Sequence, residues 1–323
     1  MNLSELSKLT EDEARETLER IRWPNGPVCA YCGCMENITK VKSKKRIGLY
    51  RCGDCKMQFT VRVNTVMHDS HLPIRLWLMA FSIMCSAKKG ISALQLQRQL
   101  GLGSYKTAWH LCHRIRFAMK QEPLKGLLQG DVMVDETYVG GVPRKYGRKD
   151  GRRKVSLPNT PRVGRGTAKT PVMALVERDG RVRAHVVPNV TARVLKKSIR
   201  ELVDPSATIM TDDYTSYRGI GRDFAGGHLT VNHSGGEYVR TVKGKKVTTN
   251  EAEAFFALLK RGITGSFHSV SKKHLNRYCD EFSFRWSLRK LEDADRTFRA
   301  IVASEGKRLI YKTPVADIMS AAL

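Results

Sequence analysis

Two pairs of cysteines near the start of the chain restrict its fold more than any other feature. Cys29 and Cys32 form one Cys-x-x-Cys pair, and Cys52 and Cys55 form a second after an interval of nineteen residues. Each pair is typical of a tight turn that presents two thiolates on one side, and two such pairs are typical of a zinc ribbon. Four buried free cysteines are the alternative, and they would not explain the paired spacing. The sequence therefore predicts one structural Zn²⁺ held by four cysteines.

The ribbon region also carries a fifth cysteine and many basic side chains. Cys34 lies beside Cys32 and is a competing ligand, which leaves the register of the first pair open. Four cysteine ligands fill the coordination of zinc, so we expect the ribbon (residues 25–70) to hold DNA and not to perform chemistry. Before it, the spacing of Thr10 and Glu13 is that of a capping box and predicts a helix within residues 1–24.

The charge of the chain indicates a polyanionic partner. Its 323 residues include 57 Lys and Arg against 31 Asp and Glu, a net charge of +26, and such an excess points to nucleic acid. No apolar segment follows the first residue, and the longest apolar run (76–87) is too short to cross a bilayer. We therefore expect a cytoplasmic protein of two or three domains, associated with the nucleoid when bound to DNA and with no membrane partner.

Residues 71–128 predict a helical region with the shape of a helix-turn-helix. We interpret 91–100 and 104–120 as helices joined by the turn Gly-Leu-Gly at 101–103. The second helix carries basic and aromatic side chains, among which Lys106 and Arg114 are candidate DNA contacts. A helical spacer packed against the next domain is an alternative with nearly equal support.

Residues 129–292 alternate between strand and helix patterns, which is typical of an α/β domain. A turn at Asp179-Gly180 should join the second and third strands, and Gly262 should end the last helix. We interpret 235–249 as a polar, basic stretch and 293–323 as a helical tail. The expected elements in order are strands at 131–139, 172–177 and 182–187, a helix at 191–202, strands at 208–210 and 228–231, and a helix at 250–261.

Three acidic residues occupy positions that such a domain can bring together. Asp135 lies in the first strand, Asp212 follows the fourth strand, and Glu253 lies on the late helix. This is the order that an RNase H-like domain requires to join three distant carboxylates. Acids inside a strand are costly to bury unless they hold a cation, and exposed strand-end carboxylates are the alternative. Lys260 follows Glu253 by seven residues, so both side chains share a helix face, either around a metal and a phosphate or as a surface pair.

A long basic loop interrupts this domain between its first two strands. The stretch 140–169 has ten basic residues and one acidic residue, with Gly and Pro throughout. Such a composition stays unfolded unless a polyanion orders it, so we interpret residues 142–170 as a DNA-contacting insertion. Its candidate DNA contacts are Arg144, Lys145, Arg148, Lys149, Arg152, Arg153 and Lys154.

Five stretches of the sequence match the motifs of a known family. They are Cys-Ala-Tyr-Cys-Gly at 29–33, Val-Asp-Glu-Thr-Tyr-Val-Gly-Gly at 134–141, Thr-Asp-Asp at 211–213, Val-Asn-His-Ser at 231–234 and the block 250–289. Over nearly its whole length the chain resembles bacterial insertion-sequence transposases of the DDE type with an N-terminal zinc ribbon. By this resemblance Asp135, Asp212 and Glu253 correspond to the three catalytic acids, and Lys260 to the basic residue after the third. Ser287 stands where Asn is more frequent.

The resemblance implies an RNase H-like, integrase-like catalytic domain, with a mixed sheet and flanking helices. It implies two Mg²⁺ or Mn²⁺ ions per active site, held by the three acids, because carboxylates suit hard cations. The expected activity is cleavage at the terminal inverted repeats and transfer of the 3′-OH ends into target DNA, with Arg261 beside Lys260 as a further DNA contact. The partner is then double-stranded DNA, from transposon ends and target, and we expect a homo-oligomer in the DNA complex.

Neighbouring acids and other functions are the alternatives. Glu136, Asp213 and Glu251 each lie close to a proposed catalytic acid, and Glu251 points about 200° away from Glu253 around the helix, so only one can face a metal. The other functions are an RNase H-like metal nuclease of another kind, a domesticated zinc-ribbon DNA-binding regulator without catalysis, and a zinc-ribbon transcription factor. The intact set of acids argues against the regulator, and a transcription factor would leave residues 130–290 unexplained.

Overall fold

The computed structural model describes residues 2–43, 46–120, 126–140, 169–232, 235–242 and 244–311. The chain divides into an N-terminal unit of residues 1–120 and 289–323 and a sheet unit of residues 121–288. No helix among the described residues is long and apolar enough to cross a membrane. Outside the described residues lie seven candidate DNA contacts of the basic insertion, namely Arg144, Lys145, Arg148, Lys149, Arg152, Arg153 and Lys154.

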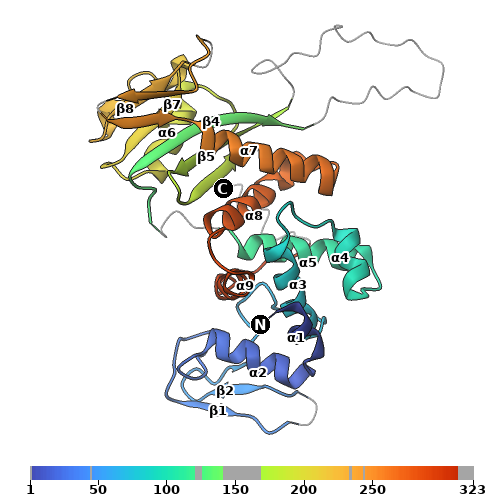
Figure 1. Cartoon of the computed structure of the whole chain (residues 1–323). Helices are drawn as coiled ribbons and strands as arrows, with labels where there is room; N and C mark the ends of the chain where they lie inside the picture. The colour runs from blue at the N-terminus through green and yellow to red at the C-terminus, as the bar shows by residue number, and fades with distance from the viewer. Residues whose placement is uncertain are drawn as a thin grey trace, which may run out of the picture. The chain divides into compact units, whose positions relative to one another are not determined.

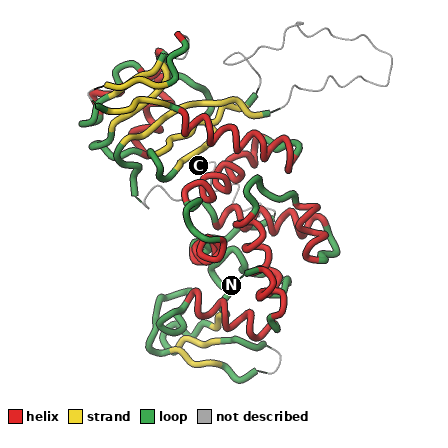
Figure 2. Tube along the Cα trace, viewed as in Figure 1, coloured by secondary structure: helices red, strands yellow, loops and turns green. Residues whose placement is uncertain are grey.

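The regular structure of the N-terminal unit is mainly helical (Figure 2). As predicted, α2 begins with a capping box, in which Thr10 Oγ1 accepts a hydrogen bond from the Glu13 N–H and the Glu13 carboxylate accepts one from the Thr10 N–H. The predicted apolar run forms the buried helix α3, and Gly101, with φ of 64°, ends α4 where the turn was predicted. The helices described in this unit are α1 (Leu3–Lys8), α2 (Glu11–Arg22), α3 (Ile74–Ser86), α4 (Ala93–Leu100), α5 (Tyr105–Ala118) and α9 (Asp293–Val302).

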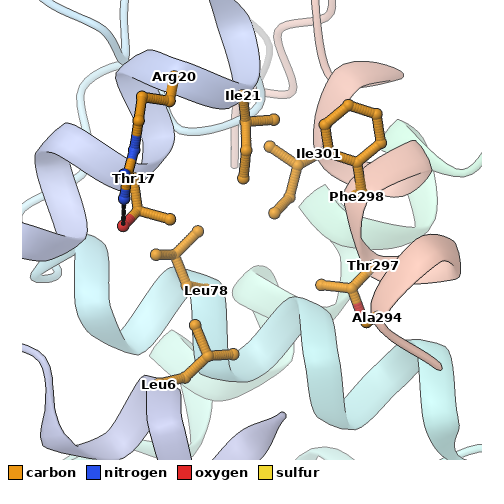
Figure 3. Close-up of a pocket in the computed structure, with 9 residues that line it drawn as sticks. All are labelled: Leu6, Thr17, Arg20, Ile21, Leu78, Ala294, Thr297, Phe298 and Ile301. Atoms are coloured by element: carbon orange, nitrogen blue, oxygen red, sulfur yellow. Dashed lines mark hydrogen bonds between the residues drawn. The ribbon is translucent and has the colours of Figure 1, made fainter. Parts of the chain in front are cut away.

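Four of these helices surround an apolar pocket of about 340 Å³ (Figure 3). Leu6 of α1, Leu78 of α3 and Ile301 of α9 line it, and beside them Arg20 donates a hydrogen bond to Thr17 at 3.2 Å. α9 packs against both α2 and α3, so this late helix belongs to the same unit as the first helices of the chain.

The ribbon is a three-stranded antiparallel sheet, in the order β1 (Ile38–Lys40), β2 (Tyr50–Cys52), β3 (Gln58–Phe59). Trp23, directly after α2, packs edge-on against the rings of Tyr50 and Phe59, with centroids 5.5 and 5.8 Å away. This aromatic cluster joins α2 to the ribbon in one small core.

The sheet unit is a mixed sheet with helices on both faces (Figure 1). Its strands lie in the order β6-β5-β4-β7-β8, with β4 antiparallel to β5 and parallel to β7. Three antiparallel strands followed by strands parallel to the first is the RNase H-like topology, as predicted. The elements are β4 (Asp131–Val139), β5 (Thr170–Glu177), β6 (Val182–Val186), α6 (Ala192–Leu202), β7 (Thr208–Asp212), β8 (His228–Val231), α7 (Asn250–Gly262) and α8 (Leu275–Ser287).

The alternating side chains of β4 enter two hydrophobic cores, one on each face of the sheet. Val132 and Val134 pack in the core beneath α6, whereas Met133 packs with Phe255 and Leu259 in the core beneath α7 and α8. Successive residues of a strand point to opposite faces, so the odd-numbered residues of β4 point toward α7. This alternation decides which acid of the strand reaches which face.

Helix α8 covers the edge strand β6 with hydrogen-bond acceptors. Three side chains of the helix supply the accepting oxygens. They accept hydrogen bonds from the backbone N–H groups of every second residue of β6, which are the N–H groups that point away from β5. An edge strand with unpaired N–H groups invites pairing with another chain, so α8 protects this edge. The pairs are Ser287 Oγ with Val182 N at 3.0 Å, Ser283 Oγ with Ala184 N at 3.2 Å, and Asn276 Oδ1 with Val186 N at 2.7 Å.

The segments on either side of α7 hold regular structure that the sequence does not predict. The stretch 235–249 contains a hairpin of β9 (Val239–Val242) and β10 (Lys245–Thr248), whose polar composition hides it, although Val247 is buried in the core beneath α7. α7 ends at Gly262, as predicted, but Gly262 does not break the helical path, because it keeps a helical φ of −65° and the chain continues into a π-helical turn at Ile263–Phe267. Burial of Gly262 in a packed helix outweighs its tendency to break one.

Candidate active site and zinc site

Four sulfurs of the ribbon form a cluster with the dimensions of a zinc site. Sγ of Cys29 lies 3.6 Å from Sγ of Cys55, Sγ of Cys32 lies 3.6 Å from Sγ of Cys52, and all four lie within 4.8 Å of one another. Sulfurs placed tetrahedrally at the usual Zn–S distance lie about 3.8 Å apart, so the four fit one Zn²⁺. A hydrogen bond from the backbone N–H of Cys55 lowers the pKa of Cys52 to about 7, whereas burial and the neighbouring thiols raise the pKa of Cys32 to about 12, so the thiolate is favoured at Cys52 over Cys32.

Cys34 stands outside this cluster. Its carbonyl oxygen accepts a hydrogen bond from the Cys29 N–H at 2.9 Å, which closes the turn of the first pair. Its thiol hydrogen-bonds to Asp54, and this contact raises the pKa of Cys34. Cys34 also lies within 4.8 Å of Cys52 and Asp54 as a second group of possible ligands, but only the group with Cys29 and Cys32 brings four sulfurs together.

Asp135 and Asp212 lie on the same face of the sheet, on neighbouring strands. β4 and β7 pair as far as Met133 and Met210, and both methionines belong to the core beneath α7. Each aspartate follows two residues later on its own strand, so each points to that same face. Asp212 is the last residue of β7, where the strand end presents its carboxylate beside half-buried Asp135.

Helix α7 carries Glu253 onto this face. Glu253 and Lys260 are both exposed, as expected for side chains that share one face of the helix, whereas Glu251 accepts hydrogen bonds from the backbone N–H of Asp179. An adjoining face of α7 is buried against the sheet through Ala252, Phe255, Phe256 and Leu259.

Burial and the neighbouring acids together raise the pKa of Asp135. It is raised to about 7, mainly by burial, then by the charge of Glu136, and further by the charges of Asp212 and Glu253. A hydrogen bond from the Glu136 N–H to Asp135 Oδ1, at 2.8 Å, acts in the opposite direction. The three predicted acids are thus within electrostatic range, although among the described residues only groups that include cysteine gather their ligand atoms within 4.8 Å. Carboxylate oxygens suit Mg²⁺ or Mn²⁺, and such an ion would relieve their repulsion, so the donor set fits a hard divalent cation.

Two tyrosines beside the acids are not predicted from the sequence. The hydroxyl of Tyr217 donates to Glu136 Oε2 at 2.5 Å, and the backbone N–H of Tyr214 donates to Asp212 Oδ1 at 3.1 Å. Glu136 points away from the face of Asp135, toward the core beneath α6 in which Tyr217 is buried. Strand alternation is the signal that separates Glu136 from Asp135, but no periodicity marks a turn residue such as Tyr217.

The candidate DNA contacts within the described residues fall into two groups. Lys106 on α5 and Arg261 on α7 are exposed and remain candidates. The expectation for Arg114 is wrong, because this side chain is buried, donates to the carbonyl oxygen of His68 and lies 5.2 Å over the ring of Trp77. Burial also lowers the pKa of Arg114 to about 10. Arg114 therefore holds α5 against α3 and the segment before it.

Two family profiles match the two parts of the chain that contain these sites. The transposase zinc-ribbon domain matches residues 9–58, and the ISXO2-like transposase domain matches residues 127–287. A relative described as an uncharacterized protein in transposable element ISH50 of Halobacterium salinarum is 29% identical over 282 residues, covering 86% of this chain and 91% of the relative.

Two solved structures show a weaker similarity. The Mos1 strand transfer complex has 14% identity and a TM-score of 0.28, covering 72% of this chain and 79% of that chain. A pre-cleavage Mos1 transpososome has 14% identity and a TM-score of 0.26, covering 96% of this chain and 98% of that chain. The two family profiles place the sequence. The chain belongs to the insertion-sequence transposases in which a transposase zinc ribbon precedes an ISXO2-like transposase domain.

Proposed function

We propose that this transposase binds the terminal inverted repeats of its insertion sequence, cleaves the DNA phosphodiester with two divalent metal ions, and transfers the 3′-OH ends into target DNA. The observation that carries the proposal is the placement of Asp135 and Asp212 on one face of neighbouring strands, the face covered by the helix that carries Glu253. A purely structural role does not account for this placement, because like charges gathered in a half-buried site destabilise a fold.

Each residue of the site has a distinct part in the proposed reaction. Asp135, Asp212 and Glu253 would hold two Mg²⁺ or Mn²⁺ ions, which when bound stabilise charge on the attacking and leaving oxygens of a phosphodiester. Lys260, exposed about two turns along α7 from Glu253, would hold a phosphate near the cut, and Arg261 beside it adds a second cation. Tyr217 is fully buried and its hydroxyl donates to Glu136, so it is unsuited to attack DNA. Water, and then a DNA 3′-hydroxyl, is the nucleophile, with no covalent protein–DNA intermediate.

DNA binding is assigned to several parts of the chain. We assign it to the ribbon (25–70), to the helical region (71–128) through Lys106, and to the basic insertion (142–170). Catalysis is assigned to residues 129–292, flanked by the helix in 1–24 and the tail 293–323. We expect the protein to act on DNA as a homo-oligomer.

Nicking of labelled DNA that carries the terminal repeats tests the proposal. With Mg²⁺ the full-length protein should produce nicked strands and, with target DNA present, strand-transfer products. Without Mg²⁺ it should bind the same DNA and leave it uncut. Binding under both conditions with no cutting would identify a DNA-binding regulator and reject the catalytic proposal.

A further inference from the structure

The backbone pairing between β4 and β7 ends before it reaches the two aspartates. Its last pair is Met133 with Met210, two residues before each acid. Beyond it, Asp135 stays paired with Ala174 of β5, and Asp212 stays paired with the strand on its own outer side, β8. Backbone pairing therefore holds Asp135 against β5 and Asp212 against β8. It does not hold the two aspartates at a set distance from each other, so other contacts must do so.

The turn that follows β7 supplies such contacts to both strands. The N–H of Tyr214 donates to Asp212 Oδ1 at 3.1 Å, and a short 3₁₀ turn, η2 (Thr215–Tyr217), then brings the hydroxyl of Tyr217 to 2.5 Å from Glu136 Oε2. On β4, the N–H of Glu136 donates to Asp135 Oδ1 at 2.8 Å. A chain of hydrogen bonds thus runs from one aspartate, through the turn, to the residue that contacts the other aspartate.

The turn itself is held firmly. Tyr217 is fully buried, and its ring packs edge-on against the ring of Tyr214 at 6.0 Å. The hydroxyls of Tyr214 and Ser216 both donate to the carbonyl oxygen of Val190, at 3.2 and 3.3 Å. Burial and the charge of Glu136 raise the pKa of Tyr217 well above its usual range, so its hydroxyl remains a donor at physiological pH.

We propose that Tyr217 and Glu136 are positioning residues that set the separation of Asp135 and Asp212 for metal binding. The inference rests on the proposed function, in which these aspartates are metal ligands. Neither positioning residue needs to touch a metal or DNA. Tyr217 acts from the α6 side of the sheet, through Glu136 and the backbone of β4, on carboxylates that lie on the α7 side. Loss of the Tyr217 hydroxyl should leave the fold and its packing intact and let β4 and β7 move apart at the two aspartates.

Mn²⁺ binding by the full-length protein without DNA tests the inference, with free Mn²⁺ measured by electron paramagnetic resonance. Mn²⁺ binding that is present in the wild type and absent in Asp135→Asn is assigned to the site of the three acids. For this binding, Tyr217→Phe should raise the dissociation constant about tenfold, the lower end of the usual loss when an outer-shell partner is removed. The thermal midpoint should change little, because the ring and its packing remain.

Matched variants separate the hydrogen bond from other effects. Ser216→Ala removes a hydrogen bond of the same turn that reaches no acid, and it should leave Mn²⁺ affinity unchanged. Glu136→Ala and Glu136→Gln remove the same charge, but only Gln keeps an oxygen that can accept from Tyr217. Gln should therefore bind Mn²⁺ more tightly than Ala, and combining Tyr217→Phe with Glu136→Ala should weaken binding no further than Glu136→Ala alone.

The outcomes distinguish this inference from the proposed function. If Asp135-dependent Mn²⁺ binding is present and Tyr217→Phe does not weaken it, the positioning role is rejected while the proposed function stands. If Ser216→Ala weakens it as much as Tyr217→Phe, general loosening of the turn explains the loss and the role of Tyr217 is again rejected. If the wild type shows no Asp135-dependent binding, both proposals fail together.

Discussion

Glu251 accepts hydrogen bonds from the backbone N–H of Asp179, with its two carboxylate oxygens 3.2 and 3.1 Å from that nitrogen. Asp179 has a φ of 54° in the tight turn between β5 and β6. Glu251 is therefore engaged with a hairpin turn, whereas Glu253, two residues later, contributes charge to Asp135. The helix register thus separates a structural acid from a candidate catalytic one.

The first prediction tests this division between the two glutamates. Asp135→Asn, Asp212→Asn and Glu253→Gln should each lower the nicking rate at least about a hundredfold, the order of loss when one charge-stabilising group leaves a reacting site. DNA binding should persist or tighten, because fewer negative charges face the phosphates. Nicking and gel-shift assays on the same protein preparations measure both effects. Glu251→Gln is the matched control and should cut at nearly the wild-type rate. A dead Glu251→Gln with an active Glu253→Gln would show that the assigned register is wrong.

The second prediction concerns the zinc site. Cys52→Ser removes one sulfur of the four-cysteine cluster and should release the single Zn²⁺, because a hydroxyl is a poor substitute for a thiolate ligand. Cys34→Ser should retain the metal, since Cys34 stands outside the cluster. Metal content by mass spectrometry and repeat-DNA binding should fall together in the first variant only. Full zinc retention in Cys52→Ser would refute the ligand set.

The third prediction follows from the raised pKa of Asp135. The folded carboxyl titrates at about 7 and the unfolded one near 3.8, so the folded state holds a proton that the unfolded state has lost between these values. The free energy of unfolding of the metal-free site therefore falls as pH rises from about 4 to 7, and the penalty is complete above 7. Asp135→Asn removes this penalty. Its melting temperature should match the wild type near pH 4 and exceed it by on the order of 5 °C at pH 8.

Addition of Mg²⁺ provides the control for this pH effect. At pH 8 the ion should raise the melting temperature of the wild type, because it binds the folded site only, and should leave Asp135→Asn nearly unchanged. A melting difference between the two proteins that does not vary with pH would mean that Asp135 titrates normally.

The fourth prediction concerns the basic insertion, which lies outside the described residues. Binding to any DNA should weaken steeply with salt, with a slope of log K against log salt of about −0.9 for each phosphate contact. Replacing Arg144, Lys145, Arg148 and Lys149 with Gln should make the slope shallower by up to about 3.6 if all four meet phosphates. Fluorescence anisotropy at several salt concentrations measures the slope. An unchanged slope would show that this part of the insertion does not contact DNA.

Local patterns in the sequence predict much of this fold. The alternation of β4 defines its limits and faces, and the cysteine spacing defines the ribbon, because both depend on short-range geometry. The polar hairpin of β9 and β10 leaves no such pattern, since only a few of its residues are buried. The sequence predicts the end of α7 at Gly262 but not the π-helical turn that follows it, because packing of Gly262 against the core outweighs a local signal to break the helix.

The sequence predicts the individual acids of the site but not the hydrogen bonds between residues around them. Asp135, Asp212 and Glu253 can be chosen from their order along the chain, but the Tyr217–Glu136 hydrogen bond joins residues 81 positions apart and depends on tertiary structure. Arg114 shows the opposite error. A basic side chain on the second helix of a helix-turn-helix suggests a DNA contact. In the fold, however, the Arg114 side chain is buried and packs over the ring of Trp77.

The last prediction concerns the protection of β6 by α8. Ser283→Ala leaves the N–H of Ala184 without its acceptor in a buried setting, which should lower the free energy of unfolding by about 1–3 kcal/mol. Asn276→Ala removes the same kind of contact at an exposed position, where water can replace the lost acceptor, so its effect should be smaller. Ser287→Asn should be tolerated, because the amide oxygen can still accept from the N–H of Val182. Urea unfolding gives the free energies, and hydrogen exchange at the Ala184 amide reports the local opening. Equal losses for Ser283→Ala and Asn276→Ala would show that burial does not set the cost of uncovering this edge.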